Sequence, residues 1–340
     1  MTGMRDVAAV AKVSAKTVSR VFNGDPHVAP GTRERVEAAL RQLNYVPNSL
    51  ATTFRAGRSP VIGIAVPDLI DPFFGSIAKA VGQLATDNAM SIVVTDLGDD
   101  PGRERVIVES LLRQSLTGLI IAPVSRDQSY LDAWTSHTPI VFVDRGPGRV
   151  SADSFVEDDR GGALTATEHL IEHGHQRIAF LGDTTDIPTT SNRYAGYRAA
   201  LAHHGIEFDA ALVALGAKDR DGAAAAVARL ESLAAPPTAL FSSNARCTMA
   251  LVPALTQSNL AVTAFGDFPM ADLLSPAITV IDQDPLLVGQ LAGQRIIDRA
   301  NHPGRRYRRR NVLPVSLIER QSCLVGPPLR PSAVRERRAG

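Results

Sequence analysis

The chain has 340 residues, of which 44% are hydrophobic and only 5% are aromatic, and its formal net charge is +1. This apolar content is enough for packed cores and excludes a disordered chain, while two cysteines are too few for a disulfide framework or a zinc site. No apolar run approaches the ~18 residues of a membrane-spanning helix, and the N-terminus lacks the apolar stretch of a signal peptide, so we expect a soluble, cytoplasmic protein with no membrane partner.

The charge is unevenly distributed along the chain. Residues 1–58 contain nine lysine and arginine residues and four acidic residues, a net charge of +5. The remaining residues contain 27 basic and 31 acidic side chains, a net charge of −4. A small basic segment before a mildly acidic body suggests that the segment binds a polyanion, although chance could produce the same imbalance in so short a stretch.

Three short helical patterns occupy the first 43 residues. In each pattern the apolar residues recur at spacings of three and four, which predicts one buried helix face. Ser14 is a suitable N-cap for the second helix and Pro30 is a suitable first residue for the third. The expected core residues are Val7, Val10, Ala11, Val18, Val21, Phe22, Val36, Leu40 and Leu43. Three such helices can bury a shared core that none could bury alone.

The second helix presents a different set of residues outward. In a helix-turn-helix, the second helix enters the DNA major groove and its N-terminal side chains reach base edges. Lys16 and Arg20 can donate hydrogen bonds to guanine, and Ala15 can offer a methyl contact. Short hydrogen-bonding side chains suited to phosphates accompany them: Thr17, Ser19 and Asn23. The spacing favours a DNA-binding head, with an ordinary solvated helix face as the alternative.

The identities of the residues in this segment are more specific than the spacing of its apolar positions. DVAAVAKVSAKTVSRVFN, followed by TRERVEAALRQLNYVPNSLA, resembles the head of the lactose-repressor (LacI/GalR) family of bacterial transcription regulators. The resemblance implies that Ala15, Lys16 and Arg20 read bases. It also implies contacts to the DNA backbone from Ser14, Thr17, Ser19, Asn23 and His27. Lys12 stands where the family usually has glycine, so a left-handed backbone there would cost about 1 kcal/mol.

Residues 47–59 join the head to the body. They contain poor helix formers, so an isolated helix here would be marginal and a linker is the simplest interpretation. By the family resemblance this segment is the hinge helix, which orders on the operator and inserts an apolar side chain into the minor groove. Phe54 stands at the usual leucine position, with Ala51 and Arg55 beside it, and phenylalanine is among the residues that unstack base steps.

From residue 61 onward, short apolar runs alternate with segments of helical periodicity. The expected strands are 61–67, 91–96, 118–124, 139–144, 177–183, 238–243, 260–266 and 277–282. This alternation is typical of βαβ units and parallel sheets. The number of strands favours two doubly wound lobes over a single sheet, and a TIM barrel is the main alternative on counting alone.

Several segments of the body resemble the periplasmic-binding-protein-like core of the same family: PDLIDPFF, LTGLIIAPV, TEHLIEHGHQRIAFLG, NRYAGYRAAL and AITVIDQD. The resemblance thus extends to about Cys323. It implies a small all-α helix-turn-helix head followed by an α/β core of two doubly wound parallel-sheet lobes, periplasmic-binding-protein-like type I. The expected domains are the head at 1–46, the hinge at 47–59, a core at 60–325 with lobe 1 at about 60–158 and 285–312 and lobe 2 at about 159–284 and 313–325, and a disordered tail at 326–340.

Ligands of open α/β sheets bind beyond the carboxyl ends of the strands, which here means the cleft between the lobes. Phe73 and Phe74 could stack on a sugar or base there, although core packing would explain them equally well. By the resemblance Arg193 grips the ligand, with an internal ion pair as its alternative role. Three further candidates match family pocket positions less closely. Asp144 and Asn244 each end a strand, and Gln283 lies on a crossover.

Two positions depart from the family pocket. Ala245 replaces the aspartate that usually follows the asparagine, and Gly266 replaces an aspartate that typically accepts hydrogen bonds from ligand hydroxyls. Loss of such an acceptor changes discrimination among polyols by orders of magnitude. Either the ligand is not an ordinary sugar, or Asp267 or another group takes over this role.

His169 and His173 lie four apart on an expected helix, with His175 nearby, a spacing that resembles metal sites. By the resemblance this helix packs on a sheet, so we expect no metal and no cofactor. The sequence contains no glycine-rich phosphate loop and no nucleophile elbow, so we expect no catalytic residues and no enzyme.

The residues and the resemblance together predict a homodimeric transcription regulator, most simply a repressor, that binds a near-palindromic operator in double-stranded DNA. A small-molecule effector between the lobes, such as a carbohydrate or a nucleoside, would control operator affinity. Whether the effector releases the protein or recruits it stays open. The alternatives are a solute-binding protein without a DNA role, which would need a signal peptide, and an α/β enzyme, which would turn its ligand over.

Overall fold

The computed structural model of the chain describes residues 3–22, 25–43 and 59–324, apart from the side chain of Phe22. The structure divides into two compact units, Met1–Ser59 and Pro60–Gly340. Among the described helices, none combines the length and the apolar character needed to cross a membrane.

The described residues of the first unit form three helices: α1 (Met4–Ala11), α2 (Ala15–Phe22) and α3 (Pro30–Gln42). Their shared core consists of Val7, Ala8, Ala11, Val18, Val21, Val28, Val36 and Ala39. Val10 is an exception to the predicted core, because its side chain is 42% exposed. At 100° per residue, Val7, Ala11 and Ala8 form one continuous arc of α1 and Val10 falls outside it. Leu40 and Leu43 pack against this core while partly buried, and the predicted core position of Phe22 lies outside the described side chains. The three expected helices are confirmed.

The turn between α1 and α2 explains how two short helices are brought together. Lys12 ends α1 in the left-handed conformation, with φ +53°. A lysine is unfavourable in this conformation compared with glycine, as expected from the sequence. Ser14 then caps α2, because its Oγ accepts a hydrogen bond from the backbone N–H of Thr17 at 3.1 Å.

Lobe 1 of the second unit is built on a six-stranded sheet in the order β2-β1-β3-β4-β5-β11, and every neighbouring pair is parallel. Its strands are β1 (Val61–Val66), β2 (Ser91–Asp96), β3 (Gly118–Ile121), β4 (Ile140–Val143), β5 (Asp153–Glu157) and β11 (Arg310–Leu313). Its helices are α5 (Pro72–Asp87), α6 (Pro101–Leu112), α7 (Asp132–Thr135, after a 3-10 turn at Ser129–Leu131) and α12 (Pro285–Asn301).

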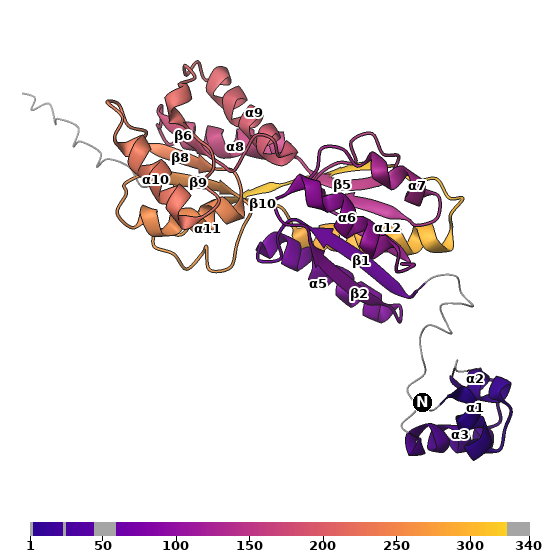
Figure 1. The fold of residues 1–340 in the computed structure, drawn as a ribbon. Helices are drawn as coiled ribbons and strands as arrows, with labels where there is room; N and C mark the ends of the chain where they lie inside the picture. The colour runs from indigo at the N-terminus through magenta and orange to yellow at the C-terminus, as the bar shows by residue number, and fades with distance from the viewer. Residues whose placement is uncertain (1–2, 23–24, 44–58, 325–340) are drawn as a thin grey trace, which may run out of the picture. The chain divides into compact units, whose positions relative to one another are not determined.

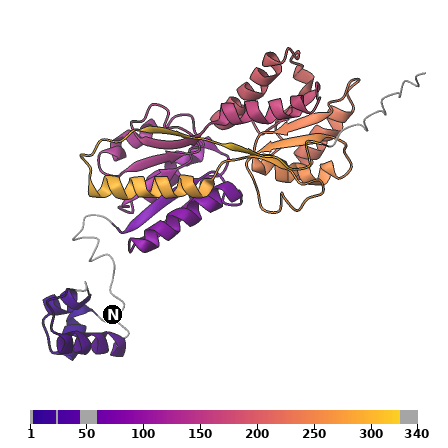
Figure 2. The same cartoon turned by 180° about the vertical axis from the view of Figure 1, so that it is seen from behind.

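The sheet of lobe 1 is covered on both faces. Apolar residues of α5 and α12 pack on the face that carries Ile62 and Ile64, whereas α6 packs on the face that carries Ala65. Figure 2 shows α12, in yellow, beside α5. This arrangement explains the continuous apolar runs in the sequence, because strands buried on both faces cannot alternate with polar residues.

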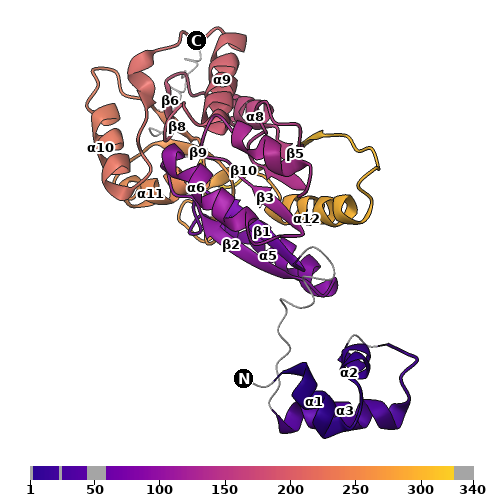
Figure 3. The same ribbon diagram turned by 45° about the vertical axis from the view of Figure 1, so that its right-hand side comes forward.

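Lobe 2 repeats the same architecture, with the strand order β7-β6-β8-β9-β10-β12. Its strands are β6 (Ile178–Leu181), β7 (Val213–Ala214), β8 (Ala239–Ser242), β9 (Ala261–Phe265), β10 (Thr279–Asp282) and β12 (Ser316–Ile318). Its helices are α8 (Asp159–Glu172), α9 (Pro188–His203), a 3-10 turn at Ala210–Leu212, α10 (Arg220–Glu231) and α11 (Ala245–Leu255). Helices α8 and α9 lie against one face of the sheet and α10 and α11 against the other, as Figures 1 and 3 show.

The chain passes between the lobes three times: from β5 to α8, from β10 to α12, and from β11 to β12. The first two passages end in a helix, whereas the third joins two strands directly. β12 runs antiparallel to β10, in contrast to the other pairs of the sheet. The cause is geometric: a chain that leaves one sheet at its carboxyl edge enters the facing sheet at its carboxyl edge and therefore runs against the strands there.

The predicted fold class, two doubly wound lobes behind a small all-α head, is confirmed. All eight expected strands are present, each within or at the bounds that the apolar runs indicated. Four strands were not predicted: β5, β7, β11 and β12. β7 has only two residues, and exposed positions alternate in β11, so neither contains the apolar run on which the prediction depended.

Candidate functional site

The exposed side of α2 is the first candidate site. Lys16 and Arg20 both point to solvent there, and Arg20 is held in place by a residue that the sequence did not single out. The Arg20 Nε atom lies 2.7 Å from Oδ2 of Asp25. The other oxygen of Asp25 accepts a hydrogen bond from the backbone N–H of His27 at 2.9 Å. These donors hold the pKa of Asp25 well below its usual range, the hydrogen bond from Arg20 first among them.

The remaining residues expected to contact DNA are placed as follows. Ser14 and His27 are exposed, and Thr17 and Ser19 are half-buried. Ala15 is also half-buried and packs against the core of the head, so only part of its methyl group can reach a base edge. Four of the residues expected to contact DNA lie outside the described residues: Asn23, Ala51, Phe54 and Arg55.

The second candidate site is a cavity of about 660 Å³ within the second unit. Its lining comes from both lobes, from the loops that follow the carboxyl ends of the strands. Six predicted effector residues line it: Phe73, Phe74, Asp144, Arg193, Asn244 and Gln283. The position agrees with the general rule for ligands of doubly wound sheets.

Asp267 is the exception among the predicted effector residues, because the structure does not bring it into this cavity. Its two carboxylate oxygens accept hydrogen bonds from Nη1 and Nη2 of Arg320 at 3.0 and 2.6 Å. A two-pronged ion pair of this kind occupies the carboxylate. Asp267 also borders a smaller cavity together with Phe73 and Gln283, so its role in place of the missing family aspartate stays a prediction. Gly266 has φ +85°, and a Cβ there would lie 2.9 Å from Oε1 of Gln283.

Arg193 forms the internal ion pair that was its alternative role, and it also lines the cavity, where the grip on a ligand stays a prediction. Its Nε lies 2.7 Å from Oδ1 of Asp159, and its Nη1 donates to the carbonyl oxygen of Ser243 at 2.8 Å. The guanidinium stacks over the ring of Phe265 at 3.8 Å. The ion pair forms between α8 and α9, which pack closely. Gly196 permits this close packing, because a Cβ there would overlap the carbonyl oxygen of Arg160.

Phe73 and Phe74 likewise serve both the core and the cavity. Their side chains are 8% and 5% exposed and belong to the apolar cluster beneath α5. Their rings meet edge to face, with centroids 5.2 Å apart. Asp71 caps α5 through the backbone N–H of Phe73 at 2.9 Å, which positions both rings at the cavity wall.

Ion pairs join the two lobes across the mouth of the cavity, and the sequence did not reveal them. Asp99 of lobe 1 lies 2.8 Å from Nζ of Lys218 and 3.4 Å from Nη1 of Arg246, both in lobe 2. A third pair joins Nη2 of Arg126 to Asp186 at 2.7 Å. We call these residues the interlobe clasp. Each member follows a strand or begins a helix, but which of them meet depends on how the lobes face one another.

Arg246 is the best-connected member of the interlobe clasp. Besides Asp99, its guanidinium reaches Asp183 at 2.9 Å and Asp68 at 3.6 Å. Asp183 is buried and also accepts a hydrogen bond from Nδ2 of Asn244 at 2.6 Å. Burial alone would lower the pKa of Arg246, but the surrounding carboxylates, that of Asp183 first, raise it above its usual value and keep the side chain charged. Arg246 therefore supplies a positive charge next to Ala245, the position at which the family usually has an aspartate.

Glu157 lies at the first passage between the lobes. It is 4% exposed, and neither carboxylate oxygen has a hydrogen-bond partner among the described residues. Burial raises its pKa well above the usual value, and the nearby carboxylates of Asp144 and Asp159 raise it further. The carboxyl group is therefore neutral under conditions in which an exposed glutamate is charged.

Comparisons with known proteins agree with both parts of the fold. Residues 3–48 match the family described as bacterial regulatory proteins, lacI family, and residues 167–323 match the periplasmic binding protein-like domain. The chain is 29% identical over 331 residues to the ribose operon repressor of Escherichia coli (strain K12), covering 95% of this chain and 100% of the relative. It is 28% identical over 333 residues to the HTH-type transcriptional repressor PurR of Haemophilus influenzae (strain PittEE), covering 94% of this chain and 98% of that protein.

Among solved structures, the lac repressor dimer bound to operator and the anti-inducer ONPF superposes with a TM-score of 0.84. The two chains are 28% identical, and the match covers 95% of this chain and 99% of the other.

Proposed function

Because the chain belongs to the LacI family of bacterial regulatory proteins, we propose that it is a sequence-specific DNA-binding transcription regulator, a repressor whose operator affinity a small molecule controls. The observation that carries the proposal is the pairing of two features in one chain: an exposed basic face on α2 and a cavity lined by both lobes of the second unit. A regulator that reads DNA acts where the DNA is, which in a bacterium is the cytoplasm.

The head would read bases through Lys16 and Arg20. The Nε of Arg20 is paired with Oδ2 of Asp25 at 2.7 Å. The two Nη groups would then make a two-pronged contact with O6 and N7 of guanine. Asp25 thus acts as a positioning residue that holds the arginine before DNA arrives. The backbone contacts would come from Ser14, Thr17, Ser19, Asn23 and His27.

The segment that contains Phe54 would supply the minor-groove contact, with Ala51 and Arg55 beside it. Phenylalanine inserted at a base step kinks DNA. Because the chain is similar to the lac repressor dimer bound to operator, we propose a homodimer on a near-palindromic operator. If Phe54 is the wedge, Phe54→Ala will weaken binding to the operator far more than binding to random DNA. An equal loss on both would contradict the wedge.

The cavity chemistry defines the class of effector. Carboxylates such as Asp144 accept hydrogen bonds from hydroxyl groups, Arg193 donates, and the edges of Phe73 and Phe74 offer an apolar surface. Such a lining fits a small polyhydroxylated molecule, so a carbohydrate or a nucleoside is the proposed effector. Because Arg246 stands beside Ala245, the polar contacts in that corner differ from those of a pocket that carries an acid there.

Control of DNA binding would operate through closure of the lobes. An effector that contacts both lobes favours the closed form in which the interlobe clasp is made, and closure alters how lobe 1 holds the hinge segments of a dimer. Such coupling is typically about 1–3 kcal/mol and is reciprocal: operator DNA must change effector affinity by the same factor.

The decisive experiment uses full-length protein and DNA from upstream of its own operon. Footprinting should protect a near-palindromic site, and a thermal-shift screen of sugars and nucleosides should identify a ligand that changes that protection. Absence of a protected palindrome at every ligand condition would contradict the proposal. Recovery of a chemically altered ligand from the protein would instead favour an enzyme.

A further inference from the structure

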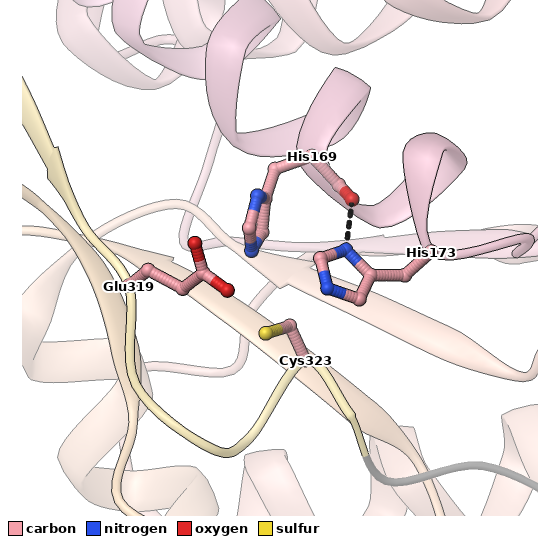
Figure 4. Close-up of side chains that lie close together, drawn as sticks. All are labelled: His169, His173, Glu319 and Cys323. Atoms are coloured by element: carbon pink, nitrogen blue, oxygen red, sulfur yellow. Dashed lines mark hydrogen bonds between the residues drawn. The ribbon is translucent and has the colours of Figure 1, made fainter.

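A cluster of four potential metal ligands lies in lobe 2, and none of the four is among the described residues that line the effector cavity. His169 and His173 lie at the C-terminal end of α8, and Glu319 and Cys323 lie just after β12. One ligand atom from each of the four lies within 4.8 Å of the others. Figure 4 shows the side chains converging from these two segments.

His169 is the residue that most needs a partner. Its side chain is 6% exposed, and within the part of the chain that the structure describes nothing forms a hydrogen bond with its Nε2. A buried ring nitrogen without a partner has lost its hydrogen bond to water, and no protein hydrogen bond replaces it. Nε2 of His169 is one of the atoms that face the other three potential ligands.

His173 is oriented as a metal ligand usually is. Its Nδ1 lies 2.8 Å from the carbonyl oxygen of His169, so it donates its proton there and leaves the lone pair on Nε2. A backbone carbonyl that fixes the tautomer in this way is the common outer partner of a ligating histidine. His175, by contrast, is bonded through Nδ1 to Thr238 at 2.9 Å and is not part of the cluster.

Glu319 and Cys323 complete the set with one oxygen and one sulfur. Cys323 is fully buried; its Sγ donates a hydrogen bond to the carbonyl oxygen of Arg320 at 3.4 Å and accepts one from Oγ1 of Thr279 at 3.5 Å. Glu319 is exposed, which leaves a path from solvent into the cluster. These two residues lie about 150 positions beyond the histidines, so the helical spacing alone could not indicate them.

The donor set selects the kind of metal. Two imidazole nitrogens, one carboxylate and one thiolate suit zinc, whereas magnesium and calcium prefer oxygen ligands only. Zinc bonds of about 2.0–2.3 Å in a tetrahedron place the ligand atoms roughly 3.3–3.8 Å apart. The four ligand atoms lie within 4.8 Å of one another, so small side-chain rotations would bring them to the spacing that zinc requires.

We propose that His169, His173, Glu319 and Cys323 bind one zinc ion. The ion ties the end of α8 to the segment that follows β12, the strand with which the chain re-enters lobe 2. It therefore stabilises lobe 2 and anchors β12 from its C-terminal side.

The test uses full-length, tag-free protein that has been stripped with a chelator. Zinc should then bind at one ion per chain and raise the unfolding temperature, whereas magnesium should do neither. Cobalt(II) in place of zinc should give a thiolate-to-metal charge-transfer band that Cys323→Ser abolishes.

His173→Ala and Glu319→Gln change exposed residues, so both variants should fold, and the loss of His173 should weaken zinc binding by more than about 100-fold. His203→Ala is the matched control, because it removes an exposed histidine from the neighbouring α9, near Glu168 at 3.4 Å. Zinc affinity should be unchanged in that control. Failure of the stripped protein to bind zinc, or equal loss in the control and in His173→Ala, would overturn the proposal.

Discussion

The interlobe clasp can be tested at Asp99, because one conservative change there removes two contacts between the lobes. Asp99→Asn keeps the shape of the side chain but removes the charge that faces Lys218 at 2.8 Å and Arg246 at 3.4 Å. Asp99 is about half exposed, so the change leaves no unpaired charge in the interior. We expect the effector-free protein to shift from the closed toward the open form.

The expected size of this shift follows from exposure. Asp99 and Lys218 are 47% and 49% exposed, and Arg246 is 22% exposed. Pairs of this kind contribute about 0.2–1 kcal/mol each, so the two together hold the lobes closed by roughly 1 kcal/mol. That corresponds to about a fivefold change in the ratio of closed to open protein, since tenfold corresponds to about 1.4 kcal/mol. The difference between variant and wild type should shrink as salt is added.

The measurement is energy transfer between one dye on each lobe, without effector. Asp209→Asn serves as the matched control: it breaks the pair between Arg177 and Asp209, which has a similar distance of 3.0 Å and exposures of 38% and 38% but lies entirely within lobe 2. The reasoning is refuted if Asp99→Asn has the closed fraction of the wild type, or if Asp209→Asn shifts it equally.

Three further changes test other parts of the structure. Arg20→Ala should cost about 1–3 kcal/mol on the operator and relax base preference, and a gel shift that shows the same loss on scrambled DNA would contradict base reading. Lys12→Gly should stabilise the head by up to about 1 kcal/mol because φ there is +53°, and thermal denaturation will show the reverse if the lysine is favourable. Burial raises the pKa of Glu157 above its unfolded value, so the stability that the neutral group contributes is complete below the unfolded pKa and is lost as pH rises through the folded pKa. Urea unfolding from about pH 5 to about pH 8 should show this loss in the wild type and not in Glu157→Gln, and an equal slope in both would exclude Glu157 as its source.

The elements that could be predicted are those whose signal is local. Helices of the head follow from spacings of three and four, and the eight strands with apolar runs follow from burial on both sheet faces. Val10 was misplaced because a two-turn helix has too few residues to define its buried arc. The short β7 and the half-exposed β11 carry no such pattern, so sequence reasoning passed over them.

Within the candidate sites, strand ends could be located but their partners could not. The carboxyl ends of the strands indicated Phe73, Phe74, Asp144 and Asn244 in the cavity wall, because parallel strands present these ends at one edge. The family resemblance indicated Arg193, which lies on α9, and Gln283, which lies on a crossover. Asp267 also follows a strand, yet Arg320, 53 positions away, captures its carboxylate. Nothing near Asp267 in the sequence indicates that partner.

By itself the sequence determined the order of the elements, the basic character of the head and the edge of the sheets at which a ligand would lie. Only the tertiary structure decided which charged and ligating side chains meet. Asp99 and Lys218 are 119 positions apart, and the histidines of α8 meet Cys323 only after the chain has returned from lobe 1. The physical reason is that periodicity and capping act within a few residues, whereas ion pairs and metal sites form between segments that only the packing of whole sheets and helices brings together.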